Sequence, residues 1–369
     1  MPPRIAINGA SFPQRITGVQ RYAREVSARM LAHADVRLLL PGADEAFVAP
    51  EEAVVELLPP SAWSRRLGPW VWVNTTLRAG LAPDEILWSP TIRAPLWVRA
   101  HVPTVHDLSV LDHPEWFRKS VVAQWKVLLP SLCRQAPHVI TDSMFSRDRL
   151  VQHLGMAEER ISVVSCGVDL RFAGVCPDSV AELRERLGLP DRFILALGSA
   201  DPRKNIGHLL NAWRSLSPRQ RDNVRLVLAG GTARTFAKDP FLQDLPDDVL
   251  HLGYVADSDL PALYTAATVF AYPSRYEGFG LPPLEAMAAG TPVIALAATG
   301  AVAEVVEGAG LLIEGHSPGA FAEGLSELLN DASCVRTLVA EGRKRAAIYS
   351  WESSAEGVLA VLRKVGSAR

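Results

Sequence analysis

Two carboxylates, Glu277 and Glu285, bracket a glycine-rich turn in the sequence Arg-Tyr-Glu-Gly-Phe-Gly-Leu-Pro-Pro-Leu-Glu, residues 275–285. Pro283 suits the first position of a helix, and Gly290 indicates where that helix ends. Such a turn offers free backbone N–H groups and the positive end of a helix dipole to an anion. Ionised carboxylates accept hydrogen bonds from hydroxyl groups. The pattern predicts a site for a pyrophosphate flanked by hydroxyl-rich groups, as in a nucleotide sugar; the alternative is a tight turn whose Glu285 complements the dipole.

Three further segments carry residues that can bind an anion or a sugar. Arg203 and Lys204 are adjacent in a predicted strand-to-helix loop, where two cations can neutralise a diphosphate; a solvated charge pair is the alternative. Gly18 opens a predicted helix, whose amino terminus again favours an anion. His106 ends a predicted strand, and its alternative role is as a structural partner of the adjacent Asp107.

Alternating apolar strands and amphipathic helices must position these residues. This alternation predicts parallel, doubly wound sheets, and two runs of it predict two Rossmann-like domains joined near residues 165–178. A ligand then lies at the carboxyl ends of the strands. The expected strands are 4–8, 36–40, 85–88, 102–106, 138–141, 161–164, 193–197, 224–229, 249–252, 268–272, 292–296 and 310–313. The expected helices include 19–31, 120–135, 143–154, 206–216, 258–267, 318–329 and 335–348.

The composition is that of a globular protein. The 369 residues are 48% hydrophobic and 21% charged, enough for two domains of ordinary size. A formal net charge of -2 gives no case for nucleic-acid binding. The four cysteines are scattered without a C-x-x-C pair, which argues against a disulfide framework or a zinc site. With no signal peptide or apolar run of membrane-spanning length, we expect a cytoplasmic protein.

The order of residues 275–285 resembles the E-x7-E element of the retaining glycosyltransferases of family 4, which have the two-domain GT-B architecture. Residues 197–205 and 104–108 extend the resemblance, which covers nearly the whole chain and is densest from 163 to 349. It implies an α/β fold of two Rossmann-like domains facing a cleft. Residues 1–170 would form the acceptor side, residues 171–350 would bind the donor, and a last helix, 351–369, would return to the first domain.

The resemblance also implies a role for each matching residue. Glu277 and His106 are the candidate catalytic residues, and Glu285 is the implied ligand of the ribose. One departure is Ser199, which stands where some members carry an arginine, so Arg203 is expected to carry more of the charge. The implied diphosphate-binding residues are Arg203, Lys204, Gly18, Gly280 and Leu281; those for the donor sugar are Glu277, Gly278, Phe279 and His106; main-chain atoms of Tyr254 and Val255 read the nucleobase.

The function implied is the transfer of a hexose from a nucleoside diphosphate sugar to a glycan or a lipid-linked saccharide, in polysaccharide or O-antigen synthesis. GDP-mannose is the expected donor, with UDP-glucose, UDP-N-acetylglucosamine and dTDP-rhamnose as alternatives. No D-x-D motif stands out, so no metal cofactor is expected. A dehydrogenase is excluded because Pro283 replaces the third glycine of G-x-G-x-x-G, and no P-loop motif occurs. A nucleotide-sugar epimerase and a non-catalytic nucleotide- or glycan-binding protein remain as alternatives.

A cluster of aromatic and basic residues in the first half suggests a further partner. Trp63, Arg65, Arg66, Trp70 and Trp72 combine amphipathic rings with cations, as residues at a lipid interface do. The alternative is that these rings fill the core or line an acceptor groove. Peripheral attachment to the cytoplasmic face of a membrane is therefore a hypothesis.

Overall fold

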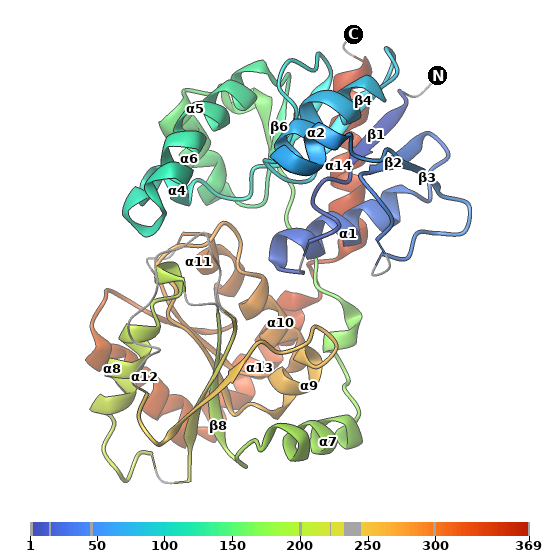
Figure 1. Ribbon diagram of the computed structural model, residues 1–369. Coiled ribbons are helices and arrows are strands. Elements are labelled where there is room, and N and C mark those ends of the chain that lie inside the picture. Colours follow the sequence, from blue (N-terminus) through green and yellow to red (C-terminus); the bar gives the residue numbers. More distant parts are fainter. Residues whose placement is uncertain are drawn as a thin grey trace. The chain divides into compact units, whose positions relative to one another are not determined.

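The computed structural model describes residues 3–14, 16–44, 47–198, 201–221, 223–231, 245–297 and 300–367, apart from the side chain of Trp63. The chain divides into two compact units (Figure 1). Unit 1 comprises Met1–Leu111, Ala123–Gly167 and Ser350–Arg369, and unit 2 comprises Asp112–Val122 and Val168–Tyr349. Each unit is built on a parallel sheet covered by helices, which confirms the predicted α/β class with two Rossmann-like domains.

The main sheet of unit 1 has five parallel strands in the order β3-β2-β1-β4-β5, and the pair β6–β7 joins β5 through a bridge between Thr104 and Ile140. β1 and β4 are neighbours, yet the chain leads from them to opposite edges of the sheet. Their carboxyl ends therefore mark the point where the strand order reverses, which is where such sheets bind ligands. The strands are β1 (Ile5–Asn8), β2 (Val36–Leu40), β3 (Val54–Leu57), β4 (Ile86–Ser89), β5 (His101–Pro103), β6 (Val139–Thr141) and β7 (Ile161–Val163).

Helices cover both faces of this sheet because successive strand residues point to opposite sides. On one face, the buried ring of Tyr22 on α1 (Gly18–Met30) contacts Trp88 of β4 and Trp351 of α14 edge-on. On the other face, Leu87 packs with Trp72 of α3. The helices of unit 1 also include α2 (Ala62–Leu67), α3 (Pro69–Trp72), a π-helical turn (Val73–Leu77), α4 (Ser109–Asp112), α5 (Lys119–Gln135), α6 (Met144–Leu154), α14 (Trp351–Ser367) and a 3-10 turn at Glu158–Arg160. The last residue of α4, the first residues of α5 and the 3-10 turn at Pro114–Trp116 between them belong to unit 2.

The sheet of unit 2 has six parallel strands in the order β10-β9-β8-β11-β12-β13. Numbered within the unit, this is the Rossmann order 3-2-1-4-5-6. The order reverses between β8 and β11, so the loops that follow these two strands meet at the expected ligand edge. The strands are β8 (Phe193–Leu197), β9 (Arg225–Ala229), β10 (Val249–Gly253), β11 (Val269–Tyr272), β12 (Val293–Leu296) and β13 (Leu311–Ile313).

Helices again lie on both faces of the sheet in unit 2 (Figure 1). Ile194 and Ala271 face a core formed with α8 and α12. Phe193 and Phe270 point the other way, where the guanidinium of Arg184 lies over the first ring and Tyr264 meets the second edge-on. The helices are α7 (Pro177–Leu187), α8 (Ile206–Ser215), α9 (Leu260–Ala266), α10 (Leu281–Ala289), α11 (Ala301–Val306), α12 (Pro318–Asn330) and α13 (Ala332–Ala346), with 3-10 turns at Leu170–Phe172 and Pro202–Lys204.

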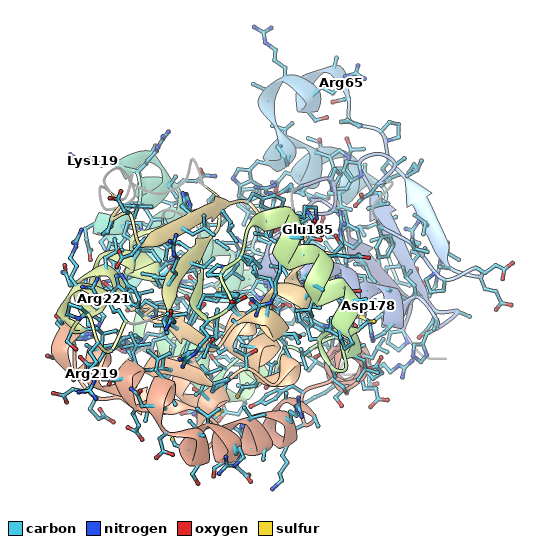
Figure 2. All side chains as sticks on the ribbon, turned by 90° about the horizontal axis from the view of Figure 1, so that it is seen from below. Arg65, Lys119, Asp178, Glu185, Arg219 and Arg221 are labelled. Carbon is cyan, nitrogen blue, oxygen red and sulfur yellow. The ribbon has the colours of Figure 1, made fainter. Side chains whose placement is uncertain are left out.

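Helix α7 shows how local sequence sets an element of this unit. Pro177 occupies its first turn, and Gly188 ends it in the left-handed conformation that glycine adopts readily. Leu183 is its buried residue, whereas Asp178 and Glu185 lie on the exposed side (Figure 2). An acid in the first turn and arginines in the last complement the helix dipole.

The structure corrects two of the sequence predictions and adds a strand that was not predicted. Helix α10 begins at Leu281 rather than at Pro283, because Gly280 already takes the N-cap position. The strand expected over 102–106 ends at Pro103, since the next residues turn toward β6 and Val105 N bonds to Ile140 O. Strand β3 was not predicted, because it is a short edge strand with exposed side chains and lacks the buried apolar run of its neighbours.

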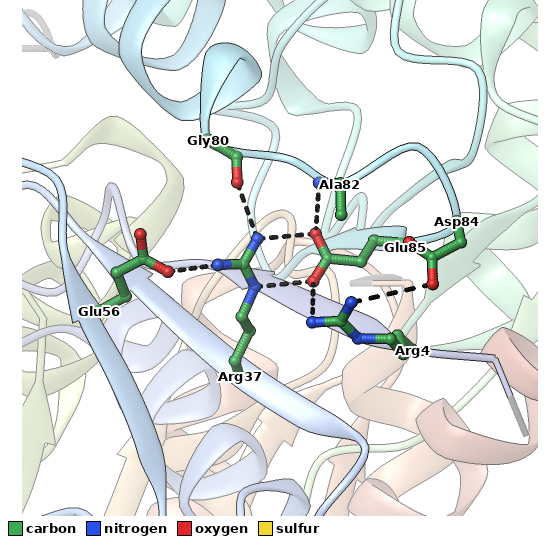
Figure 3. A network of polar contacts seen from close by, with 7 residues as sticks. All are labelled: Arg4, Arg37, Glu56, Gly80, Ala82, Asp84 and Glu85. Carbon is green, nitrogen blue, oxygen red and sulfur yellow. Dashed lines mark hydrogen bonds and ion pairs between the residues drawn. The ribbon is translucent and has the colours of Figure 1, made fainter.

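A polar network joins residues of β2 and β3 to the residues that directly precede β1 and β4 in unit 1 (Figure 3). Arg37 on β2 donates from Nε and Nη2 to the two oxygens of Glu85, each at 2.7 Å, and also to Glu56 on β3. The backbone N–H of Ala82 donates to Glu85 at 2.7 Å, and Arg4 lies 3.7 Å from it. This network lies at the edge opposite the strands' carboxyl ends, so it stabilises the sheet rather than a ligand.

Candidate active site

The loop after β8 holds the two predicted diphosphate cations. Asp201, 1% exposed, caps the 3-10 turn by accepting from Arg203 N at 2.9 Å, and its second oxygen accepts from Arg203 Nε at 2.8 Å. Burial raises the pKa of Asp201, and the charges of Arg203 and Lys204 oppose that rise. Asp201 therefore anchors the guanidinium beside the carboxyl end of β8. A Cβ at Gly198 would lie 2.8 Å from Lys204 Cγ, so the turn needs a glycine where the lysine stem crosses it.

Lys204 joins the loop after β8 to the loop after β11. Its Nζ donates to Glu277 Oε1 at 2.7 Å and to the hydroxyl of Tyr272 at 2.9 Å. Tyr272 is the last residue of β11, and Glu277 is held in place by a parallel bridge to Gly300. The side chains of Lys204 and Glu277 are 16% and 13% exposed, so the pair is partly buried but remains within reach of a ligand.

Electrostatics keep Glu277 ionised and Tyr272 protonated. Burial raises the pKa of Glu277, but the charges of Lys204 and Arg203 lower it by more, so the net pKa is below its usual value. Burial, followed by the charge of Glu277, raises the pKa of Tyr272 well above its usual value. An ammonium group has no acceptor, so the phenol oxygen of Tyr272 accepts a hydrogen bond from Lys204. The O–H of Tyr272 in turn donates a hydrogen bond to the carboxylate of Glu277. The three side chains form a closed set of hydrogen bonds.

The amino terminus of α10 lies next to this set and offers backbone donors. Gly280 has φ 114°, a conformation that strains other residues, and no side chain caps the helix. Leu281 carries the only N–H among the first three helical residues, because Pro282 and Pro283 have none. The donors available to an anion are thus concentrated at Gly280 and Leu281, the two residues that the sequence predicts.

Glu285 and Phe279 are buried in unit 2. Glu285 is 3% exposed, and its Oε2 accepts from the hydroxyl of Tyr264 at 2.9 Å. The ring of Phe279 is 6% exposed and meets Tyr349 edge-on at 5.7 Å. Phe279 therefore packs into the core with its side chain, and any contact that it makes with a sugar comes from its backbone.

The predicted nucleobase residues follow β10. Gly253 has φ 65°, which turns the chain sharply after the strand. Tyr254 is 50% exposed, whereas Val255 is 8% exposed and contributes its side chain to the core. Contacts from Val255 to a base would therefore be made by its main chain, as the sequence analysis expects.

Gly18 and His106 belong to unit 1. Gly18 begins α1, and the preceding Thr17 makes no side-chain cap, so the amino terminus of this 13-residue helix keeps its backbone donors. The hydroxyl of Thr17 bonds instead to the side chain of Gln20.

His106 is engaged on both sides of its ring. Its Nε2 donates to the carbonyl of Pro90 at 2.9 Å, and its Nδ1 lies 2.5 Å from Asp142 Oδ2. Burial lowers the pKa of His106, but Asp142 and the Pro90 carbonyl raise it by more, so the net pKa is above its usual value. The imidazole thus joins the loops after β4, β5 and β6. In this structure it offers no unengaged ring nitrogen to a sugar, and Asp107 is occupied with Ser109.

The aromatic cluster predicted to contact lipid is only partly at the surface. Trp72 is 2% exposed and its Nε1 donates to Leu58 O at 2.8 Å, so its predicted role at a lipid interface is wrong. Trp70 packs partly buried against the same core. Arg65 and Arg66 are exposed, and Figure 2 shows Arg65 on the outer side of α2. The side chain of Trp63, and Ser199, lie outside the described parts of the chain.

Several residues that complete the site were not predicted from the sequence. Tyr272, Tyr264, Asp201 and Asp142 each hold a predicted residue in position. A signal was present for Asp201, since an aspartate before Pro-Arg commonly caps a turn. Tyr272 ends a buried strand, where a tyrosine needs a polar partner for its hydroxyl. In the described ranges, no group of three or more His, Cys, Asp or Glu side chains could hold a metal ion.

Comparisons with known proteins identify the family of this chain. A family model described as glycosyl transferases group 1 matches residues 180–345, and one described as glycosyltransferase family 4 matches residues 16–172. The O-antigen chain mannosyltransferase B of Escherichia coli is 32% identical over 73% of this chain and 72% of its own length. A D-inositol 3-phosphate glycosyltransferase of Salinispora arenicola is 36% identical over 62% of this chain and 54% of its own.

Solved structures extend the likeness over the whole chain. The HepE protein of Anabaena, solved with UDP and glucose, superposes with a TM-score of 0.75 at 21% identity, covering 98% of this chain and 99% of that one. Sucrose-phosphate synthase of Thermosynechococcus elongatus gives a TM-score of 0.78 at 22% identity, with 99% of each chain covered. These neighbours share the GT-B fold. With the family matches and the full-length likeness, the chain belongs to the group 1, family 4 glycosyltransferases.

Proposed function

We propose that the protein is a retaining hexosyltransferase. It moves a hexose, for which mannose from GDP-mannose is the best candidate, to a glycan or lipid-linked saccharide during synthesis of a cell-surface polysaccharide. The observation that carries the proposal is the set formed by Lys204, Glu277 and Tyr272 at the strand-order reversal of unit 2, beside the uncapped amino terminus of α10.

The diphosphate of the donor is held by Arg203, Lys204 and the N–H groups at Gly280 and Leu281. Bringing an anion to this point lets Lys204 exchange part of its contact with Glu277 for a phosphate oxygen, which frees carboxylate lone pairs for sugar hydroxyls. Glu285 takes the ribose. The same cations stabilise the negative charge that develops on the leaving diphosphate. The positive charge comes from side chains, so we expect transfer to persist in a chelator.

The stereochemical course follows from the departing phosphate. As the anomeric bond breaks with oxocarbenium character, the acceptor hydroxyl attacks from the face that the diphosphate leaves, and a phosphate oxygen takes its proton. This course needs no dedicated general base. It suits this site because Lys204 and Arg203 lower the pKa of Glu277, which makes its carboxylate a weak proton acceptor. Glu277 then orients the sugar and stabilises its positive charge.

The choice of mannose is supported by relatives whose names state mannosyl transfer, whereas GDP as its carrier comes from the motif resemblance. One such relative is the O-antigen mannosyltransferase of Escherichia coli, and another is the MMP alpha-(1->4)-mannosyltransferase of Mycolicibacterium hassiacum, 32% identical over 73% of this chain and 65% of its own length. The HepE structure contains UDP and glucose, so UDP sugars are the first competitors.

The experiment that tests the proposal is a calorimetric panel of GDP, UDP, dTDP and ADP with their common sugars, followed by a transfer assay. We expect GDP to bind best, and Glu277→Ala to bind it nearly as wild type while losing transfer. Turnover of donor without acceptor would point to an epimerase, and nucleotide binding without any turnover to a binding protein. Unchanged transfer by Glu277→Ala would refute the site.

We also propose that unit 1 attaches peripherally to the cytoplasmic face of a membrane. Support comes from α2 and its surroundings, where Arg65, Arg66 and the 60%-exposed Leu67 combine cations with an apolar side chain. No described helix is long and apolar enough to cross a bilayer. Flotation with anionic liposomes at low salt tests this, comparing wild type with Arg65→Ser/Arg66→Ser; no binding by wild type would exclude it.

A further inference from the structure

The carboxyl edge of the unit 1 sheet holds an arginine that the mechanism does not use. Arg93 follows β4, on the loop beside the reversal of strand order between β1 and β4. Its backbone is fixed on both sides: its N–H donates to Thr91 Oγ1 at 3.2 Å, and its carbonyl accepts from Asn8 Nδ2 at 2.9 Å. Asn8 in turn bonds to Ser89 Oγ at 3.0 Å.

The guanidinium of Arg93 is partly buried and lacks a partner among the described residues. No described carboxylate or carbonyl accepts a hydrogen bond or forms an ion pair with it, and burial alone lowers its pKa. Most other partly buried cations of this chain have such a partner, as Arg24 does in Asp44 at 2.7 Å. A desolvated cation without a partner costs stability, and arginine is suited to bidentate contact with phosphate or carboxylate.

The neighbouring loop after β1 adds one further donor, the hydroxyl of Ser11. The backbone N–H of Ala10 donates to Asn8 Oδ1 at 3.1 Å, so both loops meet at the amide of Asn8. The hydroxyl of Ser11, a residue 3% exposed, has no hydrogen-bond partner in the part of the chain that the structure describes. This loop leads into the uncapped amino terminus of α1. The Ser11 hydroxyl and the helix terminus both favour negative charge at this edge.

We propose that Arg93 binds an anionic group, a phosphate or carboxylate, of the acceptor, which makes the acceptor a charged saccharide or a saccharide phosphate. This inference rests on the proposed function only in naming the anion as part of the acceptor. The other source of the same chemistry is the donor diphosphate, and the experiment separates the two.

The test measures binding of glucose 1-phosphate, inorganic phosphate and uncharged glucose by calorimetry, with GDP and UDP measured beside them. The variants are Arg93→Met, Arg93→Lys and the matched control Arg99→Met, which removes an exposed arginine of the same loop. We expect Arg93→Met to weaken the phosphate probes by about tenfold or more and to leave nucleotide affinity unchanged. Arg93→Lys should recover part of the affinity, because it keeps the charge but not the planar fork.

Each result has a separate meaning. Equal phosphate binding by wild type and Arg93→Met, with nucleotide binding intact, would overturn the site. A loss of nucleotide affinity in Arg93→Met with phosphate binding unchanged would assign Arg93 to the donor and overturn the acceptor role. If no nucleotide binds any variant, the proposed function fails, and Arg93-dependent phosphate binding still decides the anion site. Thermal unfolding of Arg93→Met should show no loss of stability, since the variant removes a desolvated charge.

Discussion

Substituting Tyr272 by Phe tests whether the three-residue set in unit 2 acts as a unit. The hydroxyl lies 2.9 Å from Lys204 Nζ on a residue 1% exposed, so it accepts a charge-assisted hydrogen bond away from water. A hydrogen bond to a charged group contributes about 1.5–3 kcal/mol. At about 1.4 kcal/mol for each tenfold change, its loss should weaken nucleoside diphosphate binding by about tenfold or more, because Lys204 is no longer held for the diphosphate.

The decisive measurement is a double-mutant cycle with Lys204→Met, using calorimetry of nucleoside diphosphate binding. If Tyr272 acts through Lys204, the second substitution should cost under about 0.5 kcal/mol in the Lys204→Met background. Phe270→Leu is the matched control, because this ring lies 5.8 Å from Tyr272 in the same core and carries no polar atom. Its effect should add to that of Lys204→Met. Full additivity of Tyr272→Phe and Lys204→Met would refute the reasoning.

Three further predictions concern other parts of the molecule. Arg37→Met leaves the buried Glu85 carboxylate without its bidentate partner and should lower the free energy of unfolding by about 3–5 kcal/mol. The double variant Arg37→Met/Glu85→Met should recover much of this loss, because it also removes the unpaired carboxylate. Chemical denaturation measures both variants, and a loss below about 1 kcal/mol for Arg37→Met would contradict the role of the network. The pKa values of His106 and Asp142 are both raised, so the folded protein holds these protons more tightly than the unfolded chain does. Stability should therefore fall as the pH rises from about 6.5 through the folded pKa of His106. Thermal unfolding of wild type and His106→Gln across this pH range checks the prediction, and identical pH profiles would disprove it. Glu285→Gln should weaken binding of ribonucleotides by about tenfold and of 2′,3′-dideoxynucleotides much less, since only the former offer ribose hydroxyls; an equal loss for both would remove Glu285 from the ribose site.

Much of the fold could be predicted because its strands are short apolar runs buried on both faces. The expected segments 36–40 and 193–197 coincide with β2 and β8, whose residues are almost all buried. β3 escaped prediction because its apolar run is short and is interrupted by Glu56; in the structure Val54 and Leu57 are each 51% exposed at the edge of the sheet. The π-helical turn at Val73–Leu77 has no local signal either, and its packing against the sheet decides its conformation.

The candidate site could be predicted where one segment supplies both the ligand-binding atoms and the conformation that they need. Gly280 and Leu281 are of this kind, because glycine and two prolines fix the turn locally. Contacts between residues on different strands could not be predicted from the sequence. Tyr272 meets Lys204 over a separation of 68 residues, and only the parallel pairing of β8 with β11 brings them together. For His106, the sequence predicted a sugar contact but gave no sign that Asp142 and Pro90 bind its two ring nitrogens.

The cations at the two predicted ligand-binding edges differ in whether a carboxylate pairs with them, and this difference supports an anion site at Arg93. In unit 2, the two cations predicted to bind the diphosphate are each paired with a carboxylate: Arg203 with Asp201 and Lys204 with Glu277. A ligand there must compete with an existing partner, so affinity is the difference between two sets of contacts. At the corresponding edge of unit 1, no carboxylate of the described residues neutralises Arg93. An anion that arrives there displaces only water, so the arginine contributes its hydrogen bonds without first breaking an ion pair. This difference predicts that phosphate binding through Arg93 is the more sensitive of the two to salt, because no internal carboxylate screens the cation.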